Sequence, residues 1–239
     1  MPDSARLSSF PKTPRARVRR RPDRGRYDRE TVFAILDSAL MCHIGYVIDG
    51  TPYVTPTLFW REGDRLYRHG SAASRMLRTQ RAGIPVCVTV SHVDGLVVAR
   101  SAFHHSLNYR AVMAFGTAAV VTDPAEKEAG FNAFLDRLYP ERSRVLRPIM
   151  AQEVKATMLM SMVIEEASAK VRTGGPVDLE SDNDADCWAG TIPVVQRVEA
   201  PVPDAQVPVR GSPADEVGHF RPGAALDQVL LGLARRRVD

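Results

Sequence analysis

The sequence predicts a mainly β protein of the α+β class, an antiparallel barrel with peripheral helices. Short runs rich in β-branched and aromatic residues alternate with Asp-Gly and Glu-Gly-Asp turns over about residues 43–122. Six or more such strands in a flat sheet would leave unpaired edges, so a closed or nearly closed barrel is favoured. The chain has 239 residues, of which 44% are hydrophobic and 25% charged, and this composition suits a soluble globular protein.

Positive charge is concentrated at the N-terminus. The net charge of the chain is +4, but residues 1–26 alone hold nine Lys or Arg and two Asp or Glu, which leaves a body of net −3. Because this segment is rich in Arg and Pro and lacks apolar periodicity, we expect 1–26 to be a disordered basic arm. An acidic body does not favour nucleic-acid binding.

Cysteine usage and hydropathy indicate the compartment. Cys42, Cys87 and Cys187 lie far apart and are odd in number, which argues against a disulfide framework and for a reducing, cytoplasmic location. No apolar run is long enough to cross a membrane, and no export signal is recognisable.

The first half of the chain reads as one helix followed by a meander. Asp28 can cap a helix in which Val32, Ile35 and Leu36 recur at helical spacing. Strands are then expected at 43–48, 51–60, 65–69 and 111–122, a helix over 71–81, and a hairpin of 85–92 with 96–102 that turns at Asp94-Gly95.

The second half adds helices and returning strands. Asp123-Pro124 opens a helix, and a second helix is expected at 152–158. The remaining expected elements are strands at 158–167, 169–172 and 188–194, a loop at 173–186, a Pro-rich linker at 201–223 and an amphipathic helix at 224–239; the folded domain is then 27–200.

A strand-to-helix junction over residues 69–75 suits a phosphate. The start of a helix offers free backbone N–H groups, Ser71 and Ser74 add hydroxyls, and Arg75 adds a bidentate cation beside His69. A Ser-capped helix with a solvated Arg is an equally good interpretation.

The strand over residues 51–60 contains a proline that cannot donate to a ladder. Pro56 is therefore expected at an edge or bulge, where Thr55 and Thr57 leave backbone groups free to bind a planar heterocycle. The alternative is that Pro56 only blunts an edge strand.

Two further motifs carry polar groups. His104 and His105 are neighbours on an expected strand and point to opposite faces, so we expect no metal site. Asn108, Tyr109 and Arg110 could contact a bound anion, although a turn Asn and a surface Arg are the ordinary alternative.

Later in the chain, Lys170 and Arg172 share one strand face, and Trp188 could cover a ligand or fill the core.

Known catalytic motifs do not explain the sequence. It has no G-x-S-x-G elbow, no Walker loop and no G-x-G-x-x-G, so hydrolase triads, P-loop chemistry and a Rossmann domain have no support. Cys42 and His43 diverge on a strand, which disfavours a thiolate nucleophile.

In their order and spacing, these motifs resemble the pyridoxamine 5′-phosphate oxidase-like FMN-binding split-barrel family, in the branch with nitroimidazole-resistance proteins. The resemblance runs from about Arg26 to Pro203. The matching pieces are Cys42-His43-Ile44-Gly45, Pro52-Tyr53-Val54-Thr55-Pro56, Leu66-Tyr67-Arg68-His69-Gly70-Ser71 with Ser74-Arg75, Asn108-Tyr109-Arg110, Lys170-Val171-Arg172 and Trp188-Ala189-Gly190.

The resemblance implies a split β-barrel homodimer with FMN in two clefts at the interface. Ser71, Ser74 and Arg75 would bind the FMN phosphate. The strand Tyr53 to Leu58 would follow the flavin ring, with Thr55, Pro56 and Thr57 on its polar edge. Asn108, Tyr109 and Arg110 would complete the site, His69 would face a small substrate as a candidate catalytic residue, and Trp188 would wall that space.

The function implied is oxidoreduction, in which FMN takes a hydride from a reduced nicotinamide and passes electrons to a small acceptor such as a nitroaromatic. The alternative is a non-catalytic protein that binds a flavin, a deazaflavin or haem, with His69, His104 or His105 as axial ligand. Two departures matter: the Arg-x-His element of true pyridoxamine phosphate oxidases is missing after Trp188, and Ala111 replaces the usual Ser.

Overall fold

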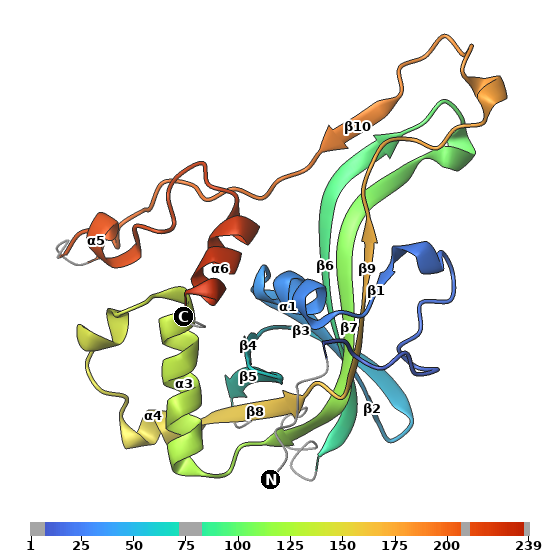
Figure 1. Cartoon of the computed structure of the whole chain (residues 1–239). Helices are drawn as coiled ribbons and strands as arrows, with labels where there is room; N and C mark the ends of the chain where they lie inside the picture. Colours follow the sequence, from blue (N-terminus) through green and yellow to red (C-terminus); the bar gives the residue numbers. More distant parts are fainter. Residues whose placement is uncertain (1–7, 72–82, 207–210, 237–239) are drawn as a thin grey trace.

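The computed structural model describes residues 8–71, 83–206 and 211–236. Within these ranges one antiparallel sheet runs in the order β3-β2-β6-β7-β8-β5-β4; β9 pairs with β7, β1 pairs with β9, and β10 pairs with β6 (Figure 1). The strands are β1 (Gly25–Arg26), β2 (Met41–Ile48), β3 (Thr51–Leu58), β4 (Trp60–Glu62), β5 (Arg65–Ser71), β6 (Ile84–Val98), β7 (Ser106–Val120), β8 (Thr157–Val163), β9 (Glu166–Arg172) and β10 (Gly190–Pro193).

The sheet curls around a core but does not close. Within the described ranges no ladder joins β3 to β4, so both stay edge strands. The mainly β class, the split barrel and the peripheral helices are confirmed. Of the closed or nearly closed barrel favoured by the sequence, the described ranges contain the form that is not closed. The helices are α1 (Arg29–Asp37), α3 (Pro124–Leu138), α4 (Ala151–Ala156), α5 (Pro213–Val217) and α6 (Leu226–Arg235). None of the helices in the described ranges is long and apolar enough to cross a bilayer.

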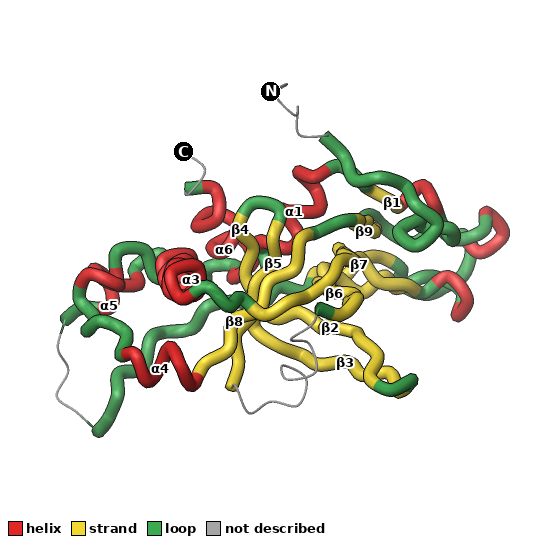
Figure 2. Tube along the Cα trace, turned by 90° about the horizontal axis from the view of Figure 1, so that it is seen from below, coloured by secondary structure: helices red, strands yellow, loops and turns green. Residues whose placement is uncertain are grey.

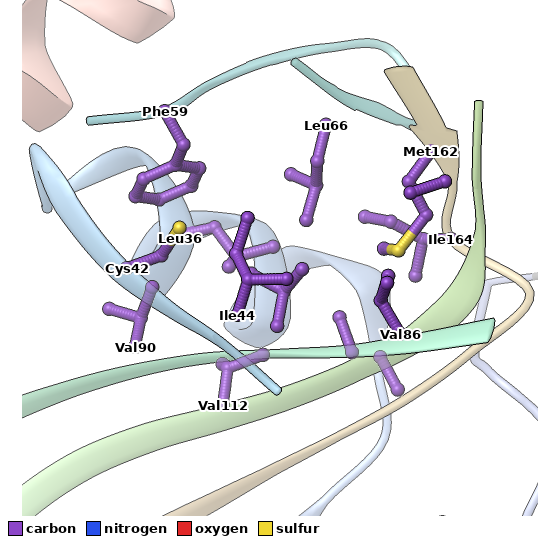
Figure 3. Close-up of a cluster of buried hydrophobic side chains, with 14 of the residues drawn as sticks. Leu36, Cys42, Ile44, Phe59, Leu66, Val86, Val90, Val112, Met162 and Ile164 are labelled. Atoms are coloured by element: carbon purple, nitrogen blue, oxygen red, sulfur yellow. The ribbon is translucent and has the colours of Figure 1, made fainter. Parts of the chain in front are cut away.

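Helix α1 covers one side of the core. The Asp28 carboxylate caps it by accepting a hydrogen bond from the backbone N–H of Thr31 at 2.8 Å, as the sequence predicts. Leu36 then packs against side chains of the sheet (Figure 3). The same core cluster includes Cys42 and Ile44 of β2, Val112 of β7 and Met162 of β8, and Cys42 is fully buried. Removal of these apolar surfaces from water stabilises the curled sheet.

The predicted hairpin at Asp94-Gly95 is wrong. Strand β6 continues through this point to Val98 and pairs with β7 on both sides of a register shift between Val93 and Gly95. The chain reverses only after β6, around the short 3-10 turn Ala102–His104. The extra residue is therefore a β-bulge, which bends the strand without ending it.

The N-terminal segment packs on the body from Ser8 onward. Phe10 is only 3% exposed and belongs to the main core, where the Arg29 guanidinium lies over its ring at 4.3 Å. The Glu166 carboxylate accepts hydrogen bonds from Thr13 and Arg15, and β1 pairs with β9 (Figure 2). The disordered arm expected over 1–26 is thus an ordered strap over 8–26, because one aromatic anchor and a carboxylate outweigh its polar composition.

Helix α6 lies against both α1 and α3 (Figure 1), where its residues Leu230 and Leu233 are buried. Helix α3 begins at the predicted cap, with Asp123 accepting from two backbone N–H groups. Its Arg137 is buried and donates to Asp37 at the end of α1, so a paired charge joins these helices. The predicted amphipathic terminal helix is therefore present, over a shorter range.

Candidate functional site

Strand β3 is an edge strand, as Pro56 predicts. Tyr53, Thr55 and Thr57 are half-buried, whereas Pro52 and Pro56 are exposed on the other face. The Thr55 hydroxyl is already engaged, because it shares a 3.0 Å hydrogen bond with the Tyr46 hydroxyl. Among the described residues, β3 pairs only with β2, so the other side of its backbone has no paired strand there.

His69, near the end of β5, lies in a box of aromatic rings. The centroid of its ring lies 5.4 Å from that of Phe134, 5.9 Å from that of Trp60 and 6.3 Å from that of Phe131. Neither ring nitrogen makes a hydrogen bond to any described residue, and Nδ1 is sealed from solvent. Burial, and then the charge of Arg68, lower the pKa of His69, so its imidazole is neutral at pH 7.

A buried nitrogen without a partner is costly, by about 1–3 kcal/mol, and such positions call for an explanation. A neutral imidazole surrounded by aromatic rings is suited to bind a metal ion that is held in an apolar macrocycle. The phosphate loop expected beside it cannot be compared: Ser71 ends β5, but Ser74, Arg75 and the helix predicted over 71–81 lie outside the described residues.

The structure brings Asn108 and Arg172 together from two separate motifs. The Arg172 guanidinium donates to the side-chain oxygen of Asn108 and to the carbonyl oxygens of Gly174 and Gly175. Asn108 in turn donates to the Gly174 carbonyl at 3.0 Å. Tyr109 lies opposite Arg172 in the β7–β9 pairing and is half-buried. These contacts fix the Asn108 amide at one end of the long strands.

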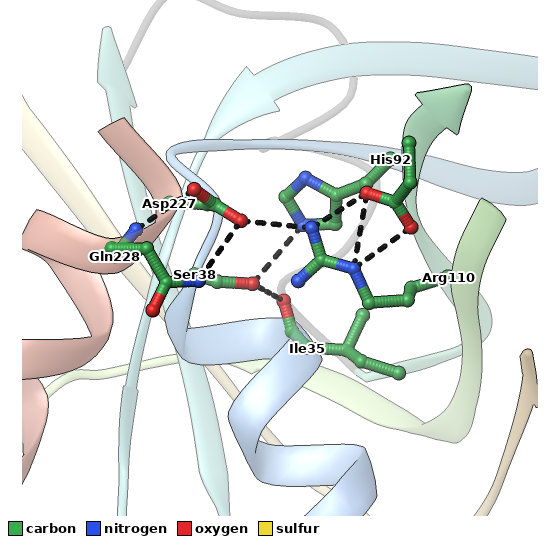
Figure 4. A network of polar contacts seen from close by, with 7 residues as sticks. Ile35, Ser38, His92, Arg110, Asp227 and Gln228 are labelled. Atoms are coloured by element: carbon green, nitrogen blue, oxygen red, sulfur yellow. Dashed lines mark hydrogen bonds and ion pairs between the residues drawn. The ribbon is translucent and has the colours of Figure 1, made fainter. Parts of the chain in front are cut away.

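Arg110 is held by two carboxylates (Figure 4). It makes a bidentate contact with Asp94, with distances of 2.7 and 2.9 Å, and it donates to Asp227 of α6 at 2.8 Å. Its charge is therefore already compensated, and as placed it does not offer the free cation expected beside a flavin edge.

His92 lies beside this cluster with a defined tautomer. The Ser38 hydroxyl donates to the Ile35 carbonyl at 2.9 Å, so it accepts from Nε2–H of His92 at 3.1 Å, which leaves Nδ1 as an acceptor (Figure 4). Burial and the charge of Arg110 lower the pKa of His92. His92 and Arg110 line a cleft of about 700 Å³ between the β6–β7 hairpin and α6.

The histidines at the hairpin tip do not lie on a strand, contrary to the prediction. His104 and His105 both turn toward Ser101: Nδ1 of His104 contacts its hydroxyl and Nδ1 of His105 contacts its carbonyl. Nδ1 of His104 also lies 3.8 Å from Asp178, and Asp182 completes a group of three potential metal ligands. Since Arg100 already pairs with the buried Asp178, the group is better described as an ion-pair network.

Trp188 lies far from His69 within one chain. It precedes β10, which pairs with residues 95–98 of β6, whereas His69 belongs to β5 and pairs with Leu159 of β8 (Figure 1). Its side chain is 63% exposed, so neither a core Trp nor a wall around the His69 of the same chain is what the structure contains.

The antiparallel sheet that does not close, with helices on its periphery, places this protein in the class of split-barrel folds. Residues 28–171 match the family model described as pyridoxamine 5′-phosphate oxidase, and the chain belongs to this family. No curated protein matches the sequence.

Two solved structures are similar over nearly their whole length. The flavocytochrome Anf3 from Azotobacter vinelandii is 44% identical, with a TM-score of 0.83 over 90% of this chain and 100% of that chain. The FAD and heme binding protein from Mycobacterium smegmatis is 33% identical, with a TM-score of 0.78 over 84% of this chain and 98% of that chain. A candidate 5-nitroimidazole antibiotic resistance protein from Bacteroides thetaiotaomicron is 22% identical over 60% of this chain and 84% of that chain, with a TM-score of 0.49.

Proposed function

We propose that this protein binds a flavin and a haem and transfers electrons between a reduced nicotinamide and a small acceptor. The observation that carries the proposal is His69, a neutral imidazole whose nitrogens have no partner among the described residues and whose surroundings are Trp60, Phe131 and Phe134. His69 would hold the haem iron through such a neutral nitrogen, and the aromatic side chains around it would contact the macrocycle.

His69 is a better candidate ligand than the other two histidines considered. His104 lies beside the carboxylates of Asp178 and Asp182, and His105 is exposed, so neither ring lies in the apolar surroundings that a macrocycle needs. The residues present at His69 fit a haem: a nitrogen to bind the metal and aromatic side chains to contact an apolar macrocycle. Haem bound there would supply one-electron chemistry.

Flavin binding is supported by the family and by the printed names of the two similar structures, a flavocytochrome and an FAD and heme binding protein. The free edge of β3 beside Thr55 and Thr57 offers backbone groups to a planar ring. We favour FAD over the FMN expected from the sequence. We propose further that two copies pair with the flavin between them, as the resemblance to the family implies.

The spectrum of purified, reconstituted protein tests the proposal. We expect two visible flavin bands together with a Soret band. His69→Ala should remove the Soret band and leave the flavin bands, whereas His105→Ala should change neither. A colourless protein that takes up neither cofactor would refute the proposal, and a retained Soret band in His69→Ala would refute the assigned ligand.

Turnover separates an enzyme from a carrier. Protein loaded with flavin should oxidise NADH or NADPH and reduce an acceptor, with a nitroaromatic as the first acceptor to try. Pyridoxamine 5′-phosphate should not be oxidised, because the Arg-x-His element is missing. Lack of nicotinamide oxidation by loaded protein would establish the non-catalytic alternative.

A further inference from the structure

Arg172 is a buried cation without a carboxylate partner among the described residues. It is 6% exposed, and its three hydrogen bonds go to the neutral oxygens of Asn108, Gly174 and Gly175. Burial of a guanidinium is costly unless an anion compensates its charge, and neutral oxygens compensate it only in part.

Further cations surround it. Pairing of β1 with β9 places Gly25 opposite Lys170, so the short 3-10 turn Pro22–Arg24 runs beside the end of β9. Burial, and then the positive charges of Arg24 and Arg21, lower the pKa of Arg172. Lys170 projects on the same side of β9 as Arg172 by strand alternation.

Few negative charges compensate the positive charges of these side chains. Arg21 pairs with Asp23 at 3.1 Å, and both side chains are exposed. Arg24 forms no ion pair with any described residue beyond its weak attraction to the neighbouring Asp23. Asp23 is thus the carboxylate that interacts with Arg21 and Arg24, whereas Arg172 contacts only neutral oxygens. An anion with two or more charges would balance the remaining positive charge.

We propose that Arg172, Arg24 and Arg21 form a binding site for the phosphate or pyrophosphate group of a nucleotide. Arg172 is fixed by Asn108 and the two glycine carbonyls, so its remaining donors are oriented before the ligand arrives. The N-terminal strap delivers the other two arginines, which gives this segment a role in binding. The inference deepens the proposed function, since the source of the phosphate would be FAD or the nicotinamide dinucleotide.

Binding of ADP and inorganic pyrophosphate to the full chain tests the site without reference to flavin. Calorimetric titration should show ADP binding to the wild type, weakened on the order of tenfold in Arg24→Gln. Arg144→Gln removes the same charge from a distant exposed position and should leave ADP affinity unchanged. Arg172→Lys should weaken binding while keeping the fold, as checked by its melting temperature.

Parallel titrations identify the source. If FAD is the ligand, Arg24→Gln should lower the affinity for FAD and leave the affinity for FMN unchanged. If the nicotinamide dinucleotide is the ligand, Arg24→Gln should instead lower the affinity for NADPH or NADH. Failure of the wild type to bind ADP or pyrophosphate, or equal affinity in Arg24→Gln and Arg144→Gln, would overturn the inference. ADP binding by a protein that takes up no flavin would leave this inference standing and refute the proposed function.

Discussion

The Arg110 guanidinium in β7 donates to the Asp227 carboxylate in α6 at 2.8 Å, across 117 residues of sequence. This contact joins the central hairpin to the C-terminal helix and closes one side of the cleft at His92. The pair is half-buried, which makes its hydrogen bonds stronger than those of an exposed ion pair.

Asp227→Asn should therefore loosen α6. We expect a loss of about 2 kcal/mol of unfolding free energy, the scale of a hydrogen bond to a charged group. Urea unfolding measures the loss, and limited proteolysis should cut earlier in residues 201–223. Asp184→Asn, on an exposed loop, serves as control. Unchanged proteolysis would mean that the apolar face alone, with Leu230 and Leu233, holds the helix.

Phe10→Ala should destabilise the whole domain. The side chain is 3% exposed in the main core, and truncation of a buried Phe costs about 3–5 kcal/mol. Phe103→Ala is the matched control, because that ring is 91% exposed and its loss should cost less than about 0.5 kcal/mol. Thermal unfolding compares the two; equal melting temperatures would show that the strap is not part of the core in solution.

Gly116→Ala should prevent β7 from packing against β8. A Cβ at Gly116 would lie 2.2 Å from the Val163 carbonyl oxygen and 2.8 Å from Cγ of Met162. Relief of this overlap requires a backbone shift, which costs about 1–3 kcal/mol or more. At Gly45 the nearest atom lies 3.7 Å away, so Gly45→Ala should be tolerated. Similar urea midpoints for both variants would contradict the strand spacing described above.

Stability should fall as the pH drops from 7 to 5. The folded-state pKa of His92 is lowered, so the unfolded chain binds the proton more readily. The contribution of His92 is complete above its unfolded pKa of about 6.5 and is lost as the pH falls toward the folded value. His92→Gln should flatten the difference in melting temperature between pH 7.5 and 5.5, whereas His105→Gln should not. If the change of melting temperature with pH were the same in His92→Gln as in the wild type, the effect would be assigned to His69, whose pKa is also lowered.

Local signals in the sequence predicted local structure well. Asp28 and Asp123 mark helix starts because a carboxylate cap acts within three residues. Pro56 marks an edge because a missing N–H cannot be replaced from elsewhere in the chain. Asp94-Gly95 led to a wrong prediction, because these residues suit either a hairpin turn or a β-bulge. In the structure the bulge places Asp94 against Arg110 on the opposite strand, a contact that is not visible in the local sequence.

The site was less predictable because its pairings are not local. Nothing near Arg110 in the sequence signals that Asp227 neutralises it, and nothing near Arg172 signals the approach of Arg24. The composition of residues 8–26 suggests disorder, yet a single apolar residue, Phe10, anchors them. The alternation that places Lys170 and Arg172 on one strand face was the signal in the sequence for the anion site proposed at Arg172.

The burial of Cys42 has a chemical consequence. Desolvation raises the pKa of its thiol to about 12, so at pH 7 only on the order of one molecule in 10⁵ carries the nucleophilic thiolate. Alkylating reagents and peroxide should therefore modify the exposed Cys187 long before Cys42. The buried thiol of Cys42 is thus unreactive in the folded protein, and the rate at which Cys42 is labelled reports how often the whole fold opens.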